Sequence, residues 1–431
     1  MRKHRITAIL LAGLVVSTFT SLSAAPAEDK VLAVTGARIV TVSGPEIAKG
    51  TLLVRNGRIE AVGADIAIPD GAEIINASGL TAYPGMIDAY SSLGLVEISG
   101  VAATVDNRET GRINPQARSL EAIRYDSMHI PIARSNGITA ALVAPSGGVI
   151  AGQSCLLGLD GWTHRDMAIK SPAFLHVELP GIPRRGGFAA LFAGQPRETA
   201  DQILKELKAL FDGARHYKKM REAAAANLTL PHPQFDETSE ALLPVIDGAL
   251  PLMISVQAEK DILAAIKFVK EQNVRAVFYG AHQAWKAAAA VKESGIPVVF
   301  GSLYEMSPVW EDGYDSLYRN PAILHEAGVK IAFSSSSAGV AKDLPYHAAK
   351  AAAFGLDRTE ALRAVTLNTA EILGLGDSLG SLDPGKRADI VLADGDILEL
   401  GTKIERVFIA GKEADLSNRY TELLDKFRRD K

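Results

Sequence analysis

The stretch YPGMIDAYSSLGL, from Tyr83 to Leu95, has the pattern of a buried strand that ends at a pocket. Apolar residues lead into it, and Tyr90 and Ser92 follow two positions apart, so they share one face of a strand. Neutral hydroxyl groups are weak ligands for the metals on which many hydrolases depend. The stretch therefore raises the question whether this pocket carries out metal-assisted chemistry at all.

The composition is that of a globular protein with a large core. The chain has 431 residues, 47% of them hydrophobic and 22% charged, with a formal net charge of −4. This length corresponds to one large domain or to two or three smaller ones. The sequence contains no long basic run, so we expect no nucleic acid as a partner. The single cysteine, Cys155, excludes an intramolecular disulfide, and its apolar neighbours predict a buried small side chain.

The N-terminal residues predict export. Arginine and lysine side chains precede the apolar run Ile6–Phe19, and small residues follow it, which is the pattern of a secretory signal peptide over residues 1–27. The apolar run is shorter than the ~20 residues that a membrane-spanning helix needs. Cleavage after Ala27 would leave a chain that starts at Glu28, and an uncleaved anchor is the alternative. We expect a periplasmic or extracellular protein with no membrane span after cleavage.

Strand patterns with glycine turns fill both ends of the remaining chain. In TLLVRNGRIEAVG, Asn56 and Gly57 separate two apolar runs, which predicts a β-hairpin. The segments GKRADIVLADGDILEL and KIERVFIAGKEA near the C-terminus have the same character. Chain termini often lie close together. We therefore expect residues 28–84 and 383–431 to form one small composite β-sandwich domain, with a tail at the C-terminal end.

The middle of the chain alternates strand and helix patterns. The strand-like runs PLMISVQ, RAVFYG, IPVVFGS and VKIAFSSSS are separated by stretches with helical spacing of apolar residues. Repeated β–α units favour a parallel sheet covered by helices. Residues 85–382 are long enough for a (β/α)₈ barrel, which typically needs ~250 residues. We predict such an α/β barrel of the TIM-like kind, and a doubly wound open sheet is the alternative.

A helix is expected to close the barrel in LDRTEALRAVTLNTAEILGLG. Asp357 can cap its first turn, and Glu360 can reach back to complete a capping box. Gly374 or Gly376 can end it.

Two motifs resemble the amidohydrolase superfamily. LTAYPGMIDAYSSLGL is similar to the family's opening motif, in which Pro-Gly-apolar-Ile-Asp leads into His-x-His. ALRAVTLNTAEILGLGDSLGSLDPGKRADIVLADGD resembles its closing motif, and GGVIAGQSCLLGLDG resembles a stretch of the secreted, imidazolonepropionase-like branch. The resemblance implies a metal-dependent barrel with a composite β-sandwich. It also implies hydrolysis of non-peptide C–N bonds in cyclic amides, amidines or amino-acid derivatives.

The positions that carry metal ligands in this family hold mostly neutral residues here. In chain order they are Tyr90 and Ser92 for the first His-x-His pair, Glu178 for the strand-four lysine or glutamate, Ser255 or Gln257 for the strand-five histidine, Gly280 for the strand-six histidine, and Ser336 or a neighbouring serine for the last aspartate. A dication needs ligands that replace its water and balance its charge. We therefore expect no metal cofactor and a pocket lined by these residues.

The candidates for catalysis without the family's metal set are His282, His347 and Glu178. His282 lies two residues beyond Gly280, and His347 follows the serine run 334–337. A nucleophilic serine would need an adjacent general base and an orienting third group. No G-x-S-x-G motif surrounds these serines. We expect His176, in FLHVEL, to be a satisfied core residue rather than a ligand.

The sequence thus favours an exported protein of amidohydrolase fold whose metal ligands have been replaced. Its expected role is that of a non-catalytic subunit, paired with an active amidohydrolase paralogue or with copies of itself, or that of a binder of a small amide-like solute. The alternative is an active hydrolase of non-peptide C–N bonds, which would use zinc or another divalent metal in an atypical site, or no metal. The loop Glu97–Arg118 is expected over the barrel mouth, where it either contacts a ligand or is solvated.

Overall fold

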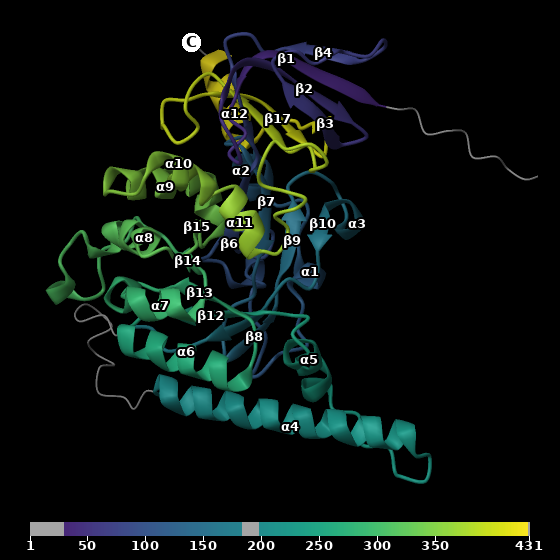
Figure 1. Ribbon diagram of the computed structural model, residues 1–431, viewed down its shortest axis with the longest axis vertical. Coiled ribbons are helices and arrows are strands. Elements are labelled where there is room, and N and C mark those ends of the chain that lie inside the picture. Colours follow the sequence, from purple (N-terminus) through teal and green to yellow (C-terminus); the bar gives the residue numbers. More distant parts are fainter. Residues whose placement is uncertain (1–29, 183–197, 430–431) are drawn as a thin grey trace, which may run out of the picture.

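The computed structural model describes residues 30–182 and 198–429, so the predicted signal peptide lies outside the described residues. Figure 1 shows an elongated molecule with a β-sheet at one end and strands covered by helices in the middle. The long helix α4 (Ala200–Ala226) crosses the opposite end and extends past the body. Among the described residues, no helix is both long and apolar enough to span a membrane.

Strands from both ends of the chain form one eight-stranded sheet. They are β1 (Val31–Ile39), β2 (Ile47–Arg55), β3 (Arg58–Gly63), β4 (Glu73–Asn76) and β5 (Thr81–Pro84) from the first part, and β16 (Ile390–Ala393), β17 (Ile404–Ile409) and β18 (Lys412–Glu413) from the last. The order is β18-β17-β16-β5-β1-β2-β3, with β4 paired to β1. The antiparallel pair β5–β16 joins the two chain ends. The prediction that both ends build one β-rich domain is confirmed.

The predicted hairpin lies within this sheet. Arg55 of β2 pairs with Arg58 of β3, so Asn56 and Gly57 form a two-residue turn. Both turn residues have positive φ, 50° and 78°. That is the conformation of a type I′ turn, whose twist matches that of the flanking strands, and asparagine and glycine adopt it at low cost.

Eight segments form the wall of the barrel. In the described residues, the parallel ones are β6 (Met86–Ser91), β7 (Ile138–Val143), β11 (Leu175–Glu178), β12 (Leu252–Val256), β13 (Ala276–Gly280), β14 (Val298–Phe300) and β15 (Ile331–Phe333). Between β7 and β11, β8 (Ile150–Gln153) and β9 (Cys155–Gly158) follow one another through Ser154 and run antiparallel to their neighbours. The TIM-like barrel is confirmed, with one wall position reversed.

The reversal follows from the short connection after β7. Parallel neighbours need a crossover of about a dozen residues or more, usually with a helix. Only six residues separate Val143 from Ile150. Gly147 and Gly148 turn the chain there with φ of 95° and 75°. The side chain of Cys155 in the returning strand is buried, as predicted, and accepts a hydrogen bond from the Ser119 hydroxyl at 3.3 Å.

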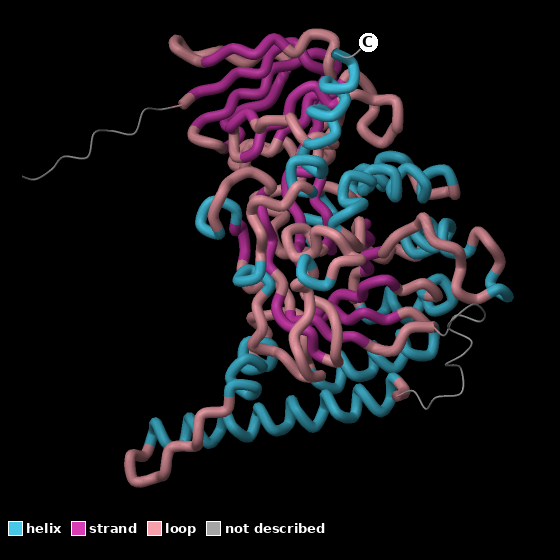
Figure 2. Tube along the Cα trace, turned by 180° about the vertical axis from the view of Figure 1, so that it is seen from behind, coloured by secondary structure: helices cyan, strands magenta, loops and turns pink. Residues whose placement is uncertain are grey.

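Helices cover one flank of the barrel, as Figure 2 shows from behind. The longer ones are α5 (Glu237–Ile246), α6 (Glu259–Gln272), α7 (Ala288–Ser294), α8 (Ser316–Glu326) and α9 (Leu344–Ala353). The C-terminal α12 (Arg419–Arg429) lies at the end of the molecule that carries the composite sheet. Shorter helices are α1 (Ser119–Ala122), α2 (His129–Arg134), α3 (His164–Met167), α10 (Arg358–Arg363) and α11 (Leu367–Ile372), with 3-10 turns at η1 (Ala102–Thr104), η3 (Ala284–Ala287), η4 (Trp310–Asp312) and η5 (Ala338–Asp343). The strand β10 (Ala168–Lys170) pairs with β9.

The single closing helix expected from the sequence is instead the pair α10 and α11. Asp357 caps the first turn as predicted, since its carboxylate accepts the Glu360 N–H at 3.0 Å. Glu360 does not reach back, because its carboxylate accepts the side-chain N–H of Asn368 at 2.6 Å. The break lies at Thr366, whose hydroxyl donates to the carbonyl four residues earlier and competes with the backbone ladder. Gly374, at φ 70°, follows the end of α11.

Candidate functional site

Strand alternation decides which side chains face the barrel interior. Phe174 packs with the interior cluster, so His176 and Glu178, two and four residues later, face the interior too. Glu178 is the register partner of Ser255, and Ser255 is that of Tyr279. Directly paired residues on neighbouring strands carry their side chains on the same face. Glu178, Ser255 and Tyr279 therefore form a row inside the mouth of the barrel.

Two tyrosine rings fill the region predicted for the first metal ligands. The Tyr90 ring stacks on Tyr279 with centroids 4.0 Å apart and planes 10° apart, and it meets the His176 ring edge-on at 5.6 Å. Burial raises the pKa of Tyr279 to about 12 and raises that of Tyr90 well above its ordinary value. Both phenols stay protonated near neutral pH, so neither is an anionic ligand.

Two buried polar atoms in the mouth have no hydrogen-bond partner among the described residues. They are Nε2 of His176, a residue that is only 3% exposed, and Oε1 of Gln257. Burial lowers the pKa of His176 to about 3, so its ring is neutral. His176 is buried in the core as predicted, but it is not satisfied, because its Nε2 has no partner among the described residues. An unpaired buried polar atom costs about 1–3 kcal/mol. Such atoms mark a place where a bound molecule would complete the hydrogen bonding.

The side chain of Gln257 packs against the backbone of Gly280. Gly280 ends β13 with φ 86°, and a Cβ at this position would lie 2.3 Å from Nε2 of Gln257. The missing side chain therefore leaves room for the glutamine amide. At the position predicted for the family's strand-six histidine, the Gln257 side chain lies where a Gly280 side chain would begin.

Glu178 presents a carboxylate at the end of β11. Its Oε1 accepts the backbone N–H of Gly147 at 2.7 Å. Burial raises its pKa, while the Gly147 hydrogen bond and the positive charge of Arg108 act in the opposite direction. Arg108 belongs to the loop Glu97–Arg118, so this part of the loop acts electrostatically on the pocket.

The serine run joins the end of β15 to β6. The Ser336 N–H donates to the Tyr90 carbonyl at 3.1 Å, and the hydroxyls of Ser334 and Ser336 lie 3.3 Å apart. Ser336 has φ 66°, which is uncommon for a residue with a side chain. Ser92 serves the same junction, since its hydroxyl accepts the Ala338 N–H at 3.0 Å. Ser92 therefore anchors a loop rather than offering its oxygen to the mouth.

Asp88 is fully buried beneath this junction. The sequence motif predicts no ligand or catalytic role for it. Its carboxylate accepts the N–H of Ser335 at 2.9 Å, the hydroxyl of Ser335, and the N–H of Tyr90 at 3.3 Å. Burial raises the pKa of Asp88 to about 7, against the hydrogen bonds from Ser335 and Tyr90. A carboxyl group inside the apolar strand MIDAY was the available signal, because a buried charge needs partners.

The weaker catalytic candidates lie in separate structural elements. His282 is in the turn between β13 and η3, and its carbonyl accepts an amide N–H of Asn320 at 3.0 Å. His347 is buried in α9, and its Nδ1 accepts the Leu303 N–H at 3.1 Å. Burial lowers the pKa of His347 to about 4. Across residues 30–182 and 198–429, no hydrogen bond links His347 or Glu178 to the serine run.

The residues of the mouth do not fit a hydrolytic metal centre. Within the described parts of the chain, no group of three or more His, Cys, Asp or Glu side chains could hold an ion. Asp88 is engaged by Ser335, and Ser92 is engaged by Ala338. The remaining donors are the Glu178 carboxyl, the neutral His176 imidazole and neutral oxygens, which are fewer strong ligands than a divalent metal needs.

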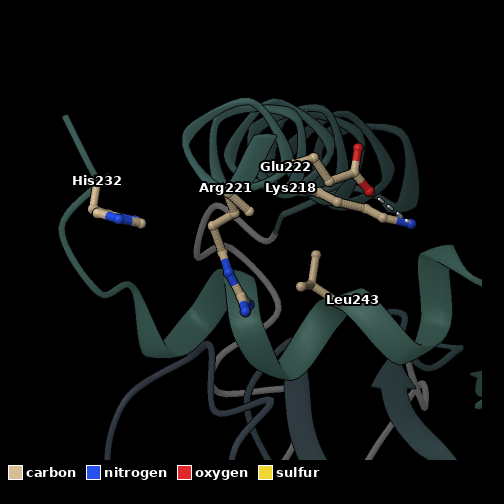
Figure 3. Close-up of a pocket in the computed structure, with 6 residues that line it drawn as sticks. Lys218, Arg221, Glu222, His232 and Leu243 are labelled. Atoms are coloured by element: carbon tan, nitrogen blue, oxygen red, sulfur yellow. Dashed lines mark ion pairs between the residues drawn. The ribbon is translucent and has the colours of Figure 1, made fainter. Parts of the chain in front are cut away.

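A cavity of about 370 Å³ lies between α4 and α5. Figure 3 shows its lining of Lys218, Arg221 and Glu222 from α4, Leu243 from α5 and His232 from the connecting segment. Two positively charged side chains in this lining already form ion pairs, Lys218 with Asp247 and Arg221 with Glu240. We assign no chemistry to this cavity.

Known proteins with similar sequences include amidohydrolases and deaminases. The family model described as "Amidohydrolase family" matches residues 206–414. Amidohydrolase tasK of Hapsidospora irregularis is 25% identical over 395 residues, which cover 84% of this chain and 39% of that protein. An adenine deaminase of Desulforamulus reducens is 23% identical over 420 residues, which cover 93% of this chain and 60% of that protein. The chain therefore spans less than two thirds of either relative.

A solved structure matches over nearly its whole length. The amidohydrolase from Thermotoga maritima MSB8 superposes with a TM-score of 0.81 at 27% sequence identity, covering 89% of this chain and 99% of that one. The similarity spans the barrel and the β-rich domain together. By motif, architecture and these comparisons, the chain is similar to proteins of the amidohydrolase superfamily.

Proposed function

We propose that this chain is an exported, non-catalytic amidohydrolase that binds a small amide-like solute at the mouth of its barrel. The observation that carries the proposal is the stacked pair Tyr90 and Tyr279, which stands where the family's metal ligands are expected. Stacked phenols offer a flat apolar surface and no charge to hold a cation. They suit a small planar molecule better than a dication.

Two unpaired buried atoms support an amide as the ligand, one on His176, which meets the Tyr90 ring, and one on Gln257 at the end of β12. Oε1 of Gln257 is an acceptor, and the neutral ring of His176 offers either a donor or an acceptor at Nε2. An amide carries both an N–H donor and a carbonyl acceptor, so one small molecule could satisfy both atoms. Because the atoms are buried, each bond would form without competition from bulk water.

The setting that we propose is the periplasm or the cell exterior, where the protein acts beside an active amidohydrolase paralogue or as a homo-oligomer. The N-terminal pattern supports export, and the replaced ligand positions support the non-catalytic role. The tasK protein and the adenine deaminase are named for activities that this chain would need a different site to perform.

The purified protein is expected to contain far less than one equivalent of zinc and to show no chelator-sensitive hydrolysis of cyclic amides. The physical reason is the lack of three strong ligands in the mouth. Metal content by mass spectrometry and turnover with and without chelator test this. Stoichiometric metal with chelator-sensitive turnover would overturn the proposal. Chelator-insensitive turnover would support the active-hydrolase alternative instead.

A cyclic amide such as hydantoin is expected to bind the protein, and Gln257→Leu is expected to weaken binding by about tenfold. Losing one acceptor of a buried hydrogen bond typically costs about 1–1.5 kcal/mol. Titration calorimetry measures the affinity. The matched control is Gln116→Leu, which changes an exposed glutamine in the loop after β6. Equal affinities of the two variants, or no binding to the parent by any cyclic amide, would contradict the solute assignment.

A further inference from the structure

The C-terminal helix α12 has no buried residue of its own. All of its residues from 419 to 428 are exposed, and only Asn418, immediately before it, is buried. The Asn418 side-chain oxygen caps the helix by accepting the N–H groups of Tyr420 at 2.9 Å and Thr421 at 3.3 Å. The helix has 11 residues, and isolated helices shorter than ~12–15 residues are marginal in water. A single capping residue therefore stabilises this helix only weakly. Contact with a surface outside the chain would stabilise it further.

One face of α12 is an exposed apolar stripe. Tyr420, Leu423, Leu424 and Phe427 recur at i, i+3, i+4 and i+7, which places them on one side of a helix. Their side chains are 56%, 38%, 49% and 64% exposed. The apolar surface continues onto the body, because Leu400, which is 77% exposed, lines a shallow cavity together with Tyr420.

The charges of α12 are sorted around this stripe. With 3.6 residues per turn, Arg419 and Lys426 flank one edge of the stripe and Arg428 flanks the other. Glu422 and Asp425 lie on the opposite face. An apolar face with cationic edges and acids turned away is the arrangement of helices that lie in a lipid–water interface, where long basic side chains reach the headgroups.

We propose that α12 is an interfacial helix that docks this protein onto an anionic lipid surface. A second copy of the chain fits the stripe less well, because helices packed face to face would bring the cationic edges of both copies together. The acids on the far side could not offset that repulsion. Anionic headgroups complement the cationic edges. The inference rests on α12 and Leu400 alone and is independent of the proposed solute site.

The test is co-sedimentation of the full chain with phosphatidylcholine vesicles that contain or lack phosphatidylglycerol. We expect binding to the anionic vesicles that weakens as salt is raised, since screening reduces the attraction. The double variant Leu424→Glu, Phe427→Glu is expected to lose binding. The double variant Arg419→Glu, Arg428→Glu is expected to bind anionic vesicles on the order of tenfold or more weakly, because each basic residue near such a surface contributes about 1 kcal/mol.

The control is Leu228→Glu, Phe235→Glu, which changes a leucine and a phenylalanine in the segment between α4 and α5 that are even more exposed, at 87% and 72%, than Leu424 and Phe427. All variants share the same N-terminus, so the apolar run Ile6–Phe19 contributes equally to each. The proposal is overturned if the parent does not bind anionic vesicles. It is also overturned if the control loses binding as fully as Leu424→Glu, Phe427→Glu. It is also overturned if size-exclusion chromatography without lipid shows a dimer or a protein complex that the α12 variant alone abolishes.

Discussion

Replacing Asp88 with alanine is expected to lower the free energy of unfolding by about 3 kcal/mol at pH 5. The substitution removes the acceptor for the N–H and hydroxyl of Ser335 and for the N–H of Tyr90, all inside the barrel wall. Each buried donor left unpaired costs about 1–3 kcal/mol. β6 and β15 belong to different ladders, so Asp88 and the Ser336–Tyr90 hydrogen bond hold the closing seam of the barrel.

Asp88→Asn is the matched variant, and it separates hydrogen bonding from charge. Asparagine keeps an acceptor oxygen and adds an N–H donor, so it resembles the protonated carboxyl. The pKa of Asp88 is about 7 in the folded protein, whereas an aspartate in an unfolded chain titrates near 3.9. The folded state therefore binds more protons between these values. The stability from this carboxyl is fully present below about pH 4 and is lost as the pH rises through about 7.

Urea unfolding of the parent and of Asp88→Asn between about pH 4 and about pH 8 measures this effect. The parent is expected to lose stability relative to the variant by on the order of 3 kcal/mol over that range, because one pKa unit corresponds to about 1.36 kcal/mol. Other titrating groups are present in both proteins, so they cancel in the difference. A difference that stays constant with pH would contradict a buried, proton-binding Asp88. If Asp88→Ala were as stable as the parent, Asp88 would not stabilise the closing seam of the barrel.

Gly380→Ala is expected to destabilise the protein by about 3 kcal/mol or more. Gly380 has φ 85°, and a Cβ there would lie 2.8 Å from the Leu367 Cα, the Thr366 carbonyl oxygen and the Ala370 Cβ. Two of these atoms belong to the backbone at the start of α11, so they cannot move aside cheaply. Left-handed strain costs about 1–3 kcal/mol and overpacking adds about 1–3 kcal/mol.

Gly385→Ala is the control, because it isolates the strain from the collision. Gly385 has φ 89°, yet a Cβ there would meet nothing within 4 Å. We expect this variant to lose only about 1 kcal/mol. Thermal or urea unfolding of the two variants measures the difference. Equal losses would show that contact with α11 is unimportant, and that the glycine of the closing motif serves only its backbone conformation.

The closing motif is explained by the same packing. The buried Lys386 ammonium donates to the hydroxyl of Ser381, which in turn donates to Asp383 at 2.6 Å. Asp383 and Lys386 are also an ion pair at 3.4 Å. The motif also reaches the composite sheet, because the Ile59 N–H of β3 donates to the Lys386 carbonyl at 2.9 Å. Its residues resemble the family's for a structural reason, so the motif identifies the fold without requiring that catalysis be retained.

The sequence alone was sufficient for the fold class. Hydrophobic periodicity and the turn residues Asn56 and Gly57 act over a few neighbouring positions, so a local pattern carries them. The prediction that Tyr90 and Ser92 stand at the positions of the family's His-x-His comes from residue identity alone, and it stays a prediction. Cys155 as a buried residue follows from its apolar neighbours in the same way.

Only the tertiary structure decided how the mouth is filled. Tyr90 and Tyr279 stack, and Asp88 meets Ser335 across 247 positions of sequence, because closure of the barrel brings strands from opposite ends of its wall together. The reversed β8–β9 segment and the unpaired His176 nitrogen likewise depend on register and neighbours. Such contacts are set by the packing of distant segments, which local sequence patterns do not encode.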